Sequence, residues 1–262
     1  MTMDRCVDIN CDMGERPEAL HDGSEEELMQ LVTSANIACG YHAGNVSIME
    51  QTVCLAVKFN VGIGAHPSYP DRKNFGRASM HLSMADVTRA VYEQIRILGD
   101  IAQARHSSLV HVKPHGALYY DAIHDTAIAQ AIADGAAKWS KDLILIGLAG
   151  SVMLDVWEER GFFVAPEAFA DRVYEKDGAL RSRRLADALI TGPAIAAQQA
   201  VNIVTKGSVI IAGGIEHPVR ATTMCIHGDT PGAIEIARAV RQKMEEAGIT
   251  IQGLKFQRRS GS

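Results

Sequence analysis

Hydrophobic and polar positions along the chain alternate between short β-rich apolar runs and longer stretches with helical spacing. In the clearest long stretch, apolar residues recur every three or four positions, at Val87, Val91, Ile95, Leu98 and Ala102. This spacing places them on one face of a helix. Short apolar runs bounded by turn residues are typical of buried strands. The pattern therefore predicts strands and helices that follow one another along the chain.

The predicted elements cover most of the sequence. Strands are expected at residues 7–11, 35–39, 61–65, 109–113, 143–148, 162–165 and 223–226. Helices are expected at residues 24–33, 46–59, 84–105, 126–139, 151–160, 193–205 and 231–247. Capping signals support three of the helix starts: Ser24 with Glu27, Ser83 with Asp86, and Thr230 before Pro231.

A regular strand–helix alternation favours an α/β fold with a mostly parallel sheet. The sheet either closes into a barrel or stays open and doubly wound. No linker interrupts the rhythm, so one domain over residues 1–255 is expected, with a loose tail at 256–262. One segment departs from the alternation: residues 209–212 and 215–219 flank two glycines, which predicts a β-hairpin.

Polar side chains share one face of several predicted strands, because side chains alternate along a strand. For Asp8, Asn10 and His111, deep in their strands, a buried hydrogen-bond network and a functional role both remain open. Function is favoured at the strand ends, since barrels and open sheets both hold their sites there. The candidates at strand ends are Asp12, His42, His66, Lys113, His115, Glu167, His227 and Asp229.

Two loops add further candidates. Residues 64–71 begin a long, turn-rich segment that ends near Arg77, and long ordered loops in compact domains are usually functional. The segment after the sixth strand carries arginines, which form either a solvated surface run or an anion site, because guanidinium matches carboxylate and phosphate. These arginines are Arg172, Arg181, Arg183 and Arg184.

Composition removes several classes of function. The chain has 262 residues, 47% of them hydrophobic, and a net charge of −5, which argues against nucleic acid as a partner. No apolar run approaches the ~20 residues of a membrane helix, and no signal-peptide pattern opens the chain, so a cytoplasmic protein is expected. Five cysteines without Cys-x-x-Cys spacing predict neither disulfides nor a zinc ribbon. The standard phosphate-binding glycine loops and the Gly-x-Ser-x-Gly elbow are absent from the sequence, which favours acid–base or metal-assisted chemistry.

Six motifs in register resemble the LamB/YcsF family from about residue 5 to 255. They are residues 7–15 (VDINCDMGE), 38–44 (ACGYHAG), 64–71 (GAHPSYPD), 112–119 (VKPHGALY), 167–172 (EAFADR) and 227–232 (HGDTPG). Asn45 departs from the pattern, since an acidic residue is expected there. The resemblance implies an irregular seven-stranded β/α barrel, similar to that of polysaccharide deacetylases. It also implies ATP-dependent opening of 5-oxoproline to glutamate by a 5-oxoprolinase with two partner subunits, B and C.

The resemblance implies roles for the candidate residues. Catalytic side chains are expected at Asp12, His42, His66, Lys113, His115, Glu167, His227 and Asp229, and substrate contacts at Asn10, Arg77, Tyr119, Asp171 and Arg172. Asp12 or Glu167 is the expected base, and Lys113 is expected to hold an anionic group rather than a structural counter-charge. ATP is expected to bind here in an unorthodox way or on one of the partners.

Two other hypotheses stay open. One is a metal-dependent deacetylase-like hydrolase acting on a carbohydrate or amide, in which Asp12, His42 and His66 hold Zn²⁺. The other is a non-catalytic scaffold protein, which the density of ionisable groups at strand ends disfavours.

Overall fold

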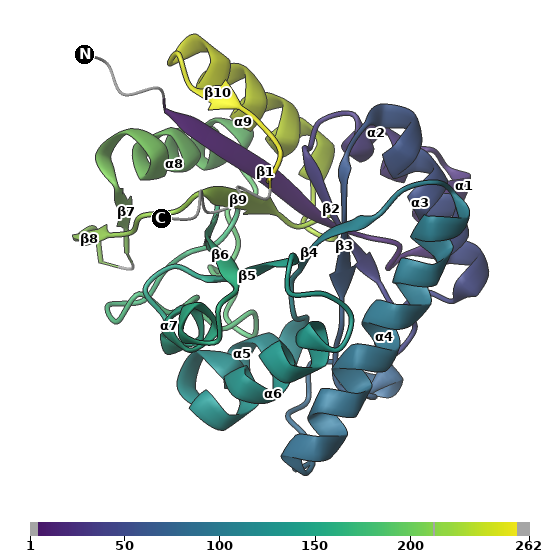
Figure 1. Ribbon diagram of the computed structural model, residues 1–262. Helices are drawn as coiled ribbons and strands as arrows, with labels where there is room; N and C mark the ends of the chain where they lie inside the picture. The colour runs from purple at the N-terminus through teal and green to yellow at the C-terminus, as the bar shows by residue number, and fades with distance from the viewer. Residues whose placement is uncertain (1–4, 212, 256–262) are drawn as a thin grey trace, which may run out of the picture.

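Seven parallel strands close into a barrel in the computed structural model, which describes residues 5–211 and 213–255 (Figure 1). Each barrel strand pairs in parallel with the next, and the last pairs with both β6 and β1. The strands are β1 (Cys6–Met13), β2 (Ser34–Ala38), β3 (Gly62–His66), β4 (Leu109–Val112), β5 (Ile144–Leu148), β6 (Phe163–Phe169) and β9 (Thr223–Ile226). The predicted barrel is confirmed, and the open doubly wound sheet is excluded.

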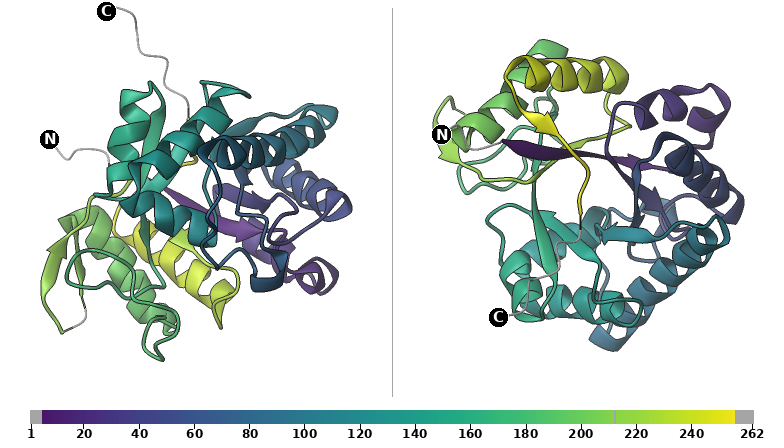
Figure 2. Two further views of the ribbon diagram at one scale, coloured as in Figure 1. Left: turned by 90° about the horizontal axis from the view of Figure 1, so that it is seen from below. Right: turned by 45° about the horizontal axis from the view of Figure 1, so that its top comes forward.

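Helices surround the barrel, as both views in Figure 2 show. The longest, α4, buries the five apolar residues whose spacing predicts it, and each is at most 1% exposed. The helices are α1 (Pro17–His21), α2 (Ser24–Met29), α3 (Val46–Phe59), α4 (Met84–Ala104), α5 (Gly116–His124), α6 (Thr126–Ala137), α7 (Val152–Glu159), α8 (Pro193–Lys206) and α9 (Ala233–Glu246), with a short 3₁₀ turn, η1 (Arg72–Asn74).

The predicted hairpin lies outside the barrel. β7 (Ser208–Ile210) and β8 (Glu216–Pro218) pair antiparallel beside α8 (Figure 1). Residue 212, at the end of its predicted first strand, and the predicted tail at 256–262 lie outside the described residues. β10 (Thr250–Ile251) adds a short parallel pairing to Cys6 and Val7 at the start of β1. All five cysteines belong to the described part and are free thiols.

Capping was predicted correctly at some helix starts and wrongly at others. Ser83 accepts a hydrogen bond from the backbone of Asp86 and caps α4, and Asn45 caps α3. The starts of α2 and α9 are different, because Gly23 and Gly232 precede them with φ of 82° and 76°. A left-handed glycine turns the chain without a side-chain cap. The predictions of a capping box at Ser24 and of an N-cap at Thr230 are therefore wrong.

The polar face of the barrel strands forms a buried hydrogen-bond network. Asp8 accepts hydrogen bonds from Ser34 at 2.7 Å and Thr223 at 2.5 Å. Farther along, Asn36 donates to Asn10 at 2.8 Å and accepts from His111 Nε2 at 2.8 Å. Of the two interpretations left open for Asp8, Asn10 and His111, the structure supports the network. These pairings leave the strand ends beyond them to form the cavity.

Candidate active site

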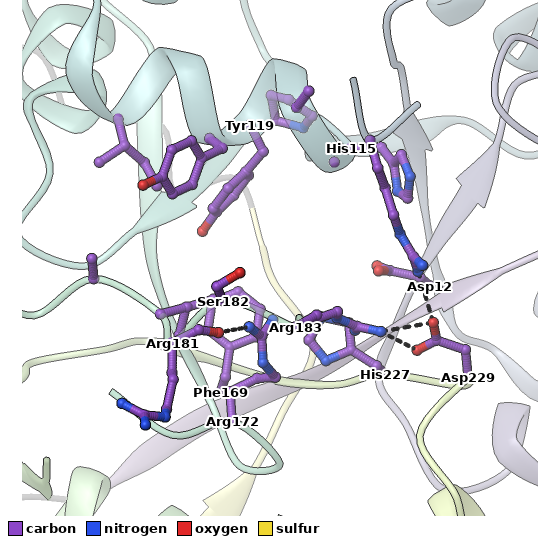
Figure 3. Close-up of a pocket in the computed structure, with 18 of the residues that line it drawn as sticks. Asp12, His115, Tyr119, Phe169, Arg172, Arg181, Ser182, Arg183, His227 and Asp229 are labelled. Carbon is purple, nitrogen blue, oxygen red and sulfur yellow. Dashed lines mark hydrogen bonds and ion pairs between the residues drawn. The ribbon is translucent and has the colours of Figure 1, made fainter. Parts of the chain in front are cut away.

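A cavity of about 660 Å³ opens at the carboxyl ends of the barrel strands. Tyr119 and His115 lie on one side of it and Arg172 and Arg183 on the other (Figure 3). The predicted site residues that line it are Asp12, His66, Arg77, Lys113, His115, Tyr119, Arg172, His227 and Asp229. Four others, Asn10, His42, Glu167 and Asp171, are buried and are not among the lining residues.

Lys113 joins the carboxylates at the floor of the cavity. Its ammonium lies 3.1 Å from Asp12 Oδ1, 2.9 Å from Glu167 Oε1 and 3.2 Å from Asn10 Oδ1. The Cys225 sulfur, at 3.1 Å, is a fourth neighbour. Burial opposes the charge, but Asp12, Cys225 and Glu167 raise the pKa of Lys113 well above its usual value. An ammonium has three N–H groups, so these partners leave no donor for an added anion. The structure therefore supports the counter-charge role, against our expectation.

Asp12 reaches the cavity from the end of β1. Asn36 donates to its Oδ1 at 2.8 Å, and His66 Nε2 lies 3.4 Å from its Oδ2. Burial disfavours the charged form, but His66 and Lys113 hold the pKa of Asp12 well below its usual range. A carboxylate held ionised in this way suits the stabilisation of positive charge better than proton abstraction at neutral pH.

Asp171 and His227 form a dyad on another wall. His227 Nδ1 lies 3.0 and 3.1 Å from the two Asp171 oxygens, and the Thr230 hydroxyl donates to Oδ2 at 2.6 Å. Burial acts against the charge, yet His227 and Thr230 lower the pKa of Asp171 to about 2. A carboxylate acceptor keeps the proton on Nδ1 and leaves Nε2 free as a base. Asp171, expected to contact substrate, is fully buried and positions His227 instead.

The arginines of the cavity differ in their partners. Asp229 accepts hydrogen bonds from Arg183 at 2.8 Å and from Arg77 at 2.9 Å, as the dashed lines in Figure 3 mark. Arg172 donates only to the backbone carbonyl of Arg181, at 2.6 Å. Within residues 5–211 and 213–255, its Nε has no hydrogen-bond partner and no carboxylate lies within ion-pair distance. Burial and Arg183 lower the pKa of Arg172 to about 10, so it remains charged at neutral pH. This guanidinium suits an anionic ligand.

A histidine cluster lies at the other end of the cavity. Glu15, His42, His66 and His115 each place a ligand-type atom within 4.8 Å of the others. The set differs from the expected Asp12, His42 and His66, because the Glu15 carboxylate takes the place at the centre. Imidazole and carboxylate donors of this kind fit a first-row divalent cation.

Glu15, Phe169 and Thr230 are the functional neighbours that sequence reasoning missed. Glu15 belongs to the motif of residues 7–15 and follows Gly14, whose φ of 68° turns the chain at the end of β1. That turn is the signal that could have identified it. Phe169 stacks on the His227 ring with centroids 5.3 Å apart, at the end of a strand predicted to stop at residue 165.

These features define a parallel β/α-barrel protein with a charged cavity at the strand ends, where barrel enzymes hold their sites. The chain belongs to the LamB/YcsF family, whose family model matches residues 7–259. No helix among the described residues is long and apolar enough to cross a bilayer.

Relatives and solved structures agree with this assignment. The chain is 47% identical to the A subunit of 5-oxoprolinase from Chloroflexus aggregans over 94% of this chain and 98% of the relative. It is 45% identical to the A subunit of 5-oxoprolinase from Methylococcus capsulatus, over 96% and 97%. The crystal structure of the lactam utilization protein from Thermus thermophilus superposes with a TM-score of 0.86 at 40% identity, over 95% of this chain and 99% of that one. A T48 deacetylase with substrate has a TM-score of 0.52 at 14% identity, over 95% and 88%, a likeness of fold alone.

Proposed function

We propose that this chain is the A subunit of an ATP-dependent 5-oxoprolinase, which hydrolyses 5-oxo-L-proline to L-glutamate while ATP becomes ADP and phosphate. The printed names of the relatives support the activity. The observation that carries it is Arg172, a buried guanidinium facing the cavity without a carboxylate partner among the described residues. Partner subunits B and C belong to the proposal, as does a place in the cytoplasm.

The substrate fits the charges of the cavity. 5-Oxoproline is a small lactam with one carboxylate, and a guanidinium binds a carboxylate through two parallel hydrogen bonds. Arg172 is free to do this, whereas Arg77 and Arg183 are held by Asp229. We therefore assign the substrate carboxylate to Arg172.

His227 supplies the acid–base chemistry in this proposal. Water adds to the lactam carbonyl carbon, the ring C–N bond breaks, and the ring nitrogen leaves with a proton. His227 Nε2 accepts the proton of the attacking water and returns one to the leaving nitrogen. Phosphorylation of the lactam oxygen by ATP makes the carbon more electrophilic, and the absence of a standard phosphate-binding loop from this sequence assigns ATP binding to the partners.

Reconstitution tests the proposal. The purified chain alone is expected to release no glutamate from 5-oxoproline and ATP, and addition of subunits B and C is expected to restore release. Arg172→Gln in the assembled enzyme is expected to raise KM for 5-oxoproline at least tenfold, while Arg184→Gln, another cavity arginine, is the matched control. Unchanged KM in the Arg172 variant contradicts the assignment, and no turnover by the wild-type assembly contradicts the proposed activity.

A second candidate is the metal-dependent deacetylase-like hydrolase, and the histidine cluster is the observation that favours it. Release of acetate from an N-acetylated sugar by the Zn²⁺-loaded chain alone would support it. Glutamate release that requires the partners, with no acetate release, supports the first candidate instead.

A further inference from the structure

Two histidines of the cluster point unprotonated nitrogens at each other. His66 Nδ1 lies 2.7 Å from the carbonyl oxygen of Lys113, and His115 Nε2 lies 2.9 Å from that of Phe75. A carbonyl only accepts, so both of these nitrogens carry hydrogen. In neutral rings the remaining atoms, His66 Nε2 and His115 Nδ1, therefore hold lone pairs, and they lie 3.0 Å apart. Two lone pairs at this distance repel unless a cation lies between them.

Glu15 completes a third corner. Its Oε1 lies 3.3 Å from His115 Nδ1 and 3.9 Å from His66 Nε2. Metal–ligand bonds of about 2.0–2.2 Å place neighbouring ligand atoms about 3.0–3.5 Å apart. Two of the three separations lie in this range and the third is slightly long. The carbonyls behind both histidines orient the rings as the outer partners of metal-bound histidines do.

His42 does not belong to the same coordination shell. Its ring stacks on that of His115, with centroids 3.8 Å apart and planes inclined by only 7°. A metal ion lies in the plane of each imidazole that binds it, and one ion cannot lie in two parallel planes. His42 Nε2 instead lies 3.1 Å from Glu15 Oε1, where it holds the carboxylate in position. Asp12 Oδ2, 3.4 Å from His66 Nε2, stands beside the remaining open side.

We propose that Glu15, His66 and His115 form a binding site for a first-row divalent cation, with Zn²⁺ as the best-suited ion. Two imidazoles and one carboxylate disfavour Mg²⁺ and Ca²⁺, which prefer oxygen ligands. All three residues line the cavity, so an open coordination position faces the ligand space. The site goes beyond the proposed function and depends on none of its steps.

Direct metal binding tests the site. The full-length chain, stripped with a chelator, is titrated with Zn²⁺ against a chromogenic competitor, and bound metal is counted by elemental analysis. One ion per chain is expected, with at least tenfold weaker binding of Mg²⁺. His66→Gln and His115→Gln are each expected to weaken Zn²⁺ binding at least a hundredfold. His227→Gln, a cavity histidine outside the three, is expected to keep one ion per chain.

Glu15→Gln guards against misfolding of the histidine variants, because it removes the charge with almost no change in volume. It is expected to retain the wild-type circular dichroism spectrum and to bind Zn²⁺ at least tenfold more weakly. Zn²⁺ is also expected to raise the melting temperature of the wild type but not of this variant. Failure of the wild type to bind Zn²⁺, or equal binding by Glu15→Gln and the wild type, overturns the proposal.

Discussion

Lys113 shows how one residue joins the strands of the barrel interior. Its ammonium contacts groups from β1, β6 and β9 within 3.2 Å. Glu167 beside it is completely buried, so removal of the lysine leaves that carboxylate without a cationic partner. Lys113→Met is therefore expected to lower the free energy of unfolding by about 3–5 kcal/mol.

Denaturant unfolding at pH 7 measures this loss. The double variant Lys113→Met/Glu167→Gln is expected to recover part of it, because the stranded charge is gone. Lys58→Met is the control, since its ion pair with Glu26 is exposed and is worth about 1 kcal/mol or less. A Lys113→Met protein as stable as the wild type but deficient in substrate binding would restore the anion-binding role.

Asp171 acts on a second residue rather than on the substrate. Asp171→Asn preserves shape but allows the amide to donate, which favours the tautomer of His227 with its proton on Nε2. Turnover by the assembled enzyme is expected to fall about 10²-fold or more, through kcat rather than KM. Ser182→Ala, at another cavity residue, is the matched control. Steady-state kinetics with near-normal kcat would remove His227 from the role of base.

At the scale of elements, β3 depends on a residue without a side chain. A Cβ added at Gly64 would lie 1.9 Å from His111 Nε2, whereas one added at Gly62 meets nothing closer than 3.4 Å. Gly64→Ala must displace a ring that is hydrogen-bonded across the barrel. It is expected to cost about 1–3 kcal/mol of stability, as overpacking does. Gly62→Ala, on the same face of the same strand, is expected to cost less than about 1 kcal/mol, and equal melting temperatures would contradict this.

The elements also show what sequence could predict. Apolar periodicity located all seven barrel strands, because their burial repeats in the sequence. It stopped β6 at residue 165, although Pro166 O accepts from Thr222 N and the strand continues to Phe169. A missing N–H is tolerated where the carbonyl alone pairs. Helix starts after left-handed glycines were misplaced, since no side chain marks them.

The candidate site divides in the same way. Alternation along a strand predicts which residues share a face, and it brought Asp12, Lys113 and His115 to the cavity. It does not predict which residues meet across the barrel. Asp171 and His227 are 56 positions apart, and their hydrogen bond follows from the closure of β6 against β9. The roles of Asp171 and Lys113 therefore needed the structure.

At the scale of the whole molecule, the buried network makes stability depend on pH. His111 is completely buried, and its Nε2 donates to Asn36 at 2.8 Å, while its Nδ1 has no partner among the described residues. Burial, with the charges of Lys113 and His66, lowers the pKa of His111 to about 3. The same imidazole titrates near its ordinary value of about 6.5 in the unfolded chain.

Between about pH 6.5 and pH 3 the unfolded state therefore binds a proton that the folded state does not. Stability is fully present above this window and falls as the pH decreases through it, by up to about 1.4 kcal/mol per pH unit from this residue. His111→Gln keeps a side-chain donor and is expected to flatten the decline between pH 7 and 5. Urea unfolding at several pH values measures it, with the exposed His81→Gln as control. An identical pH slope in His111→Gln and the wild type would place the proton uptake on other groups of the barrel.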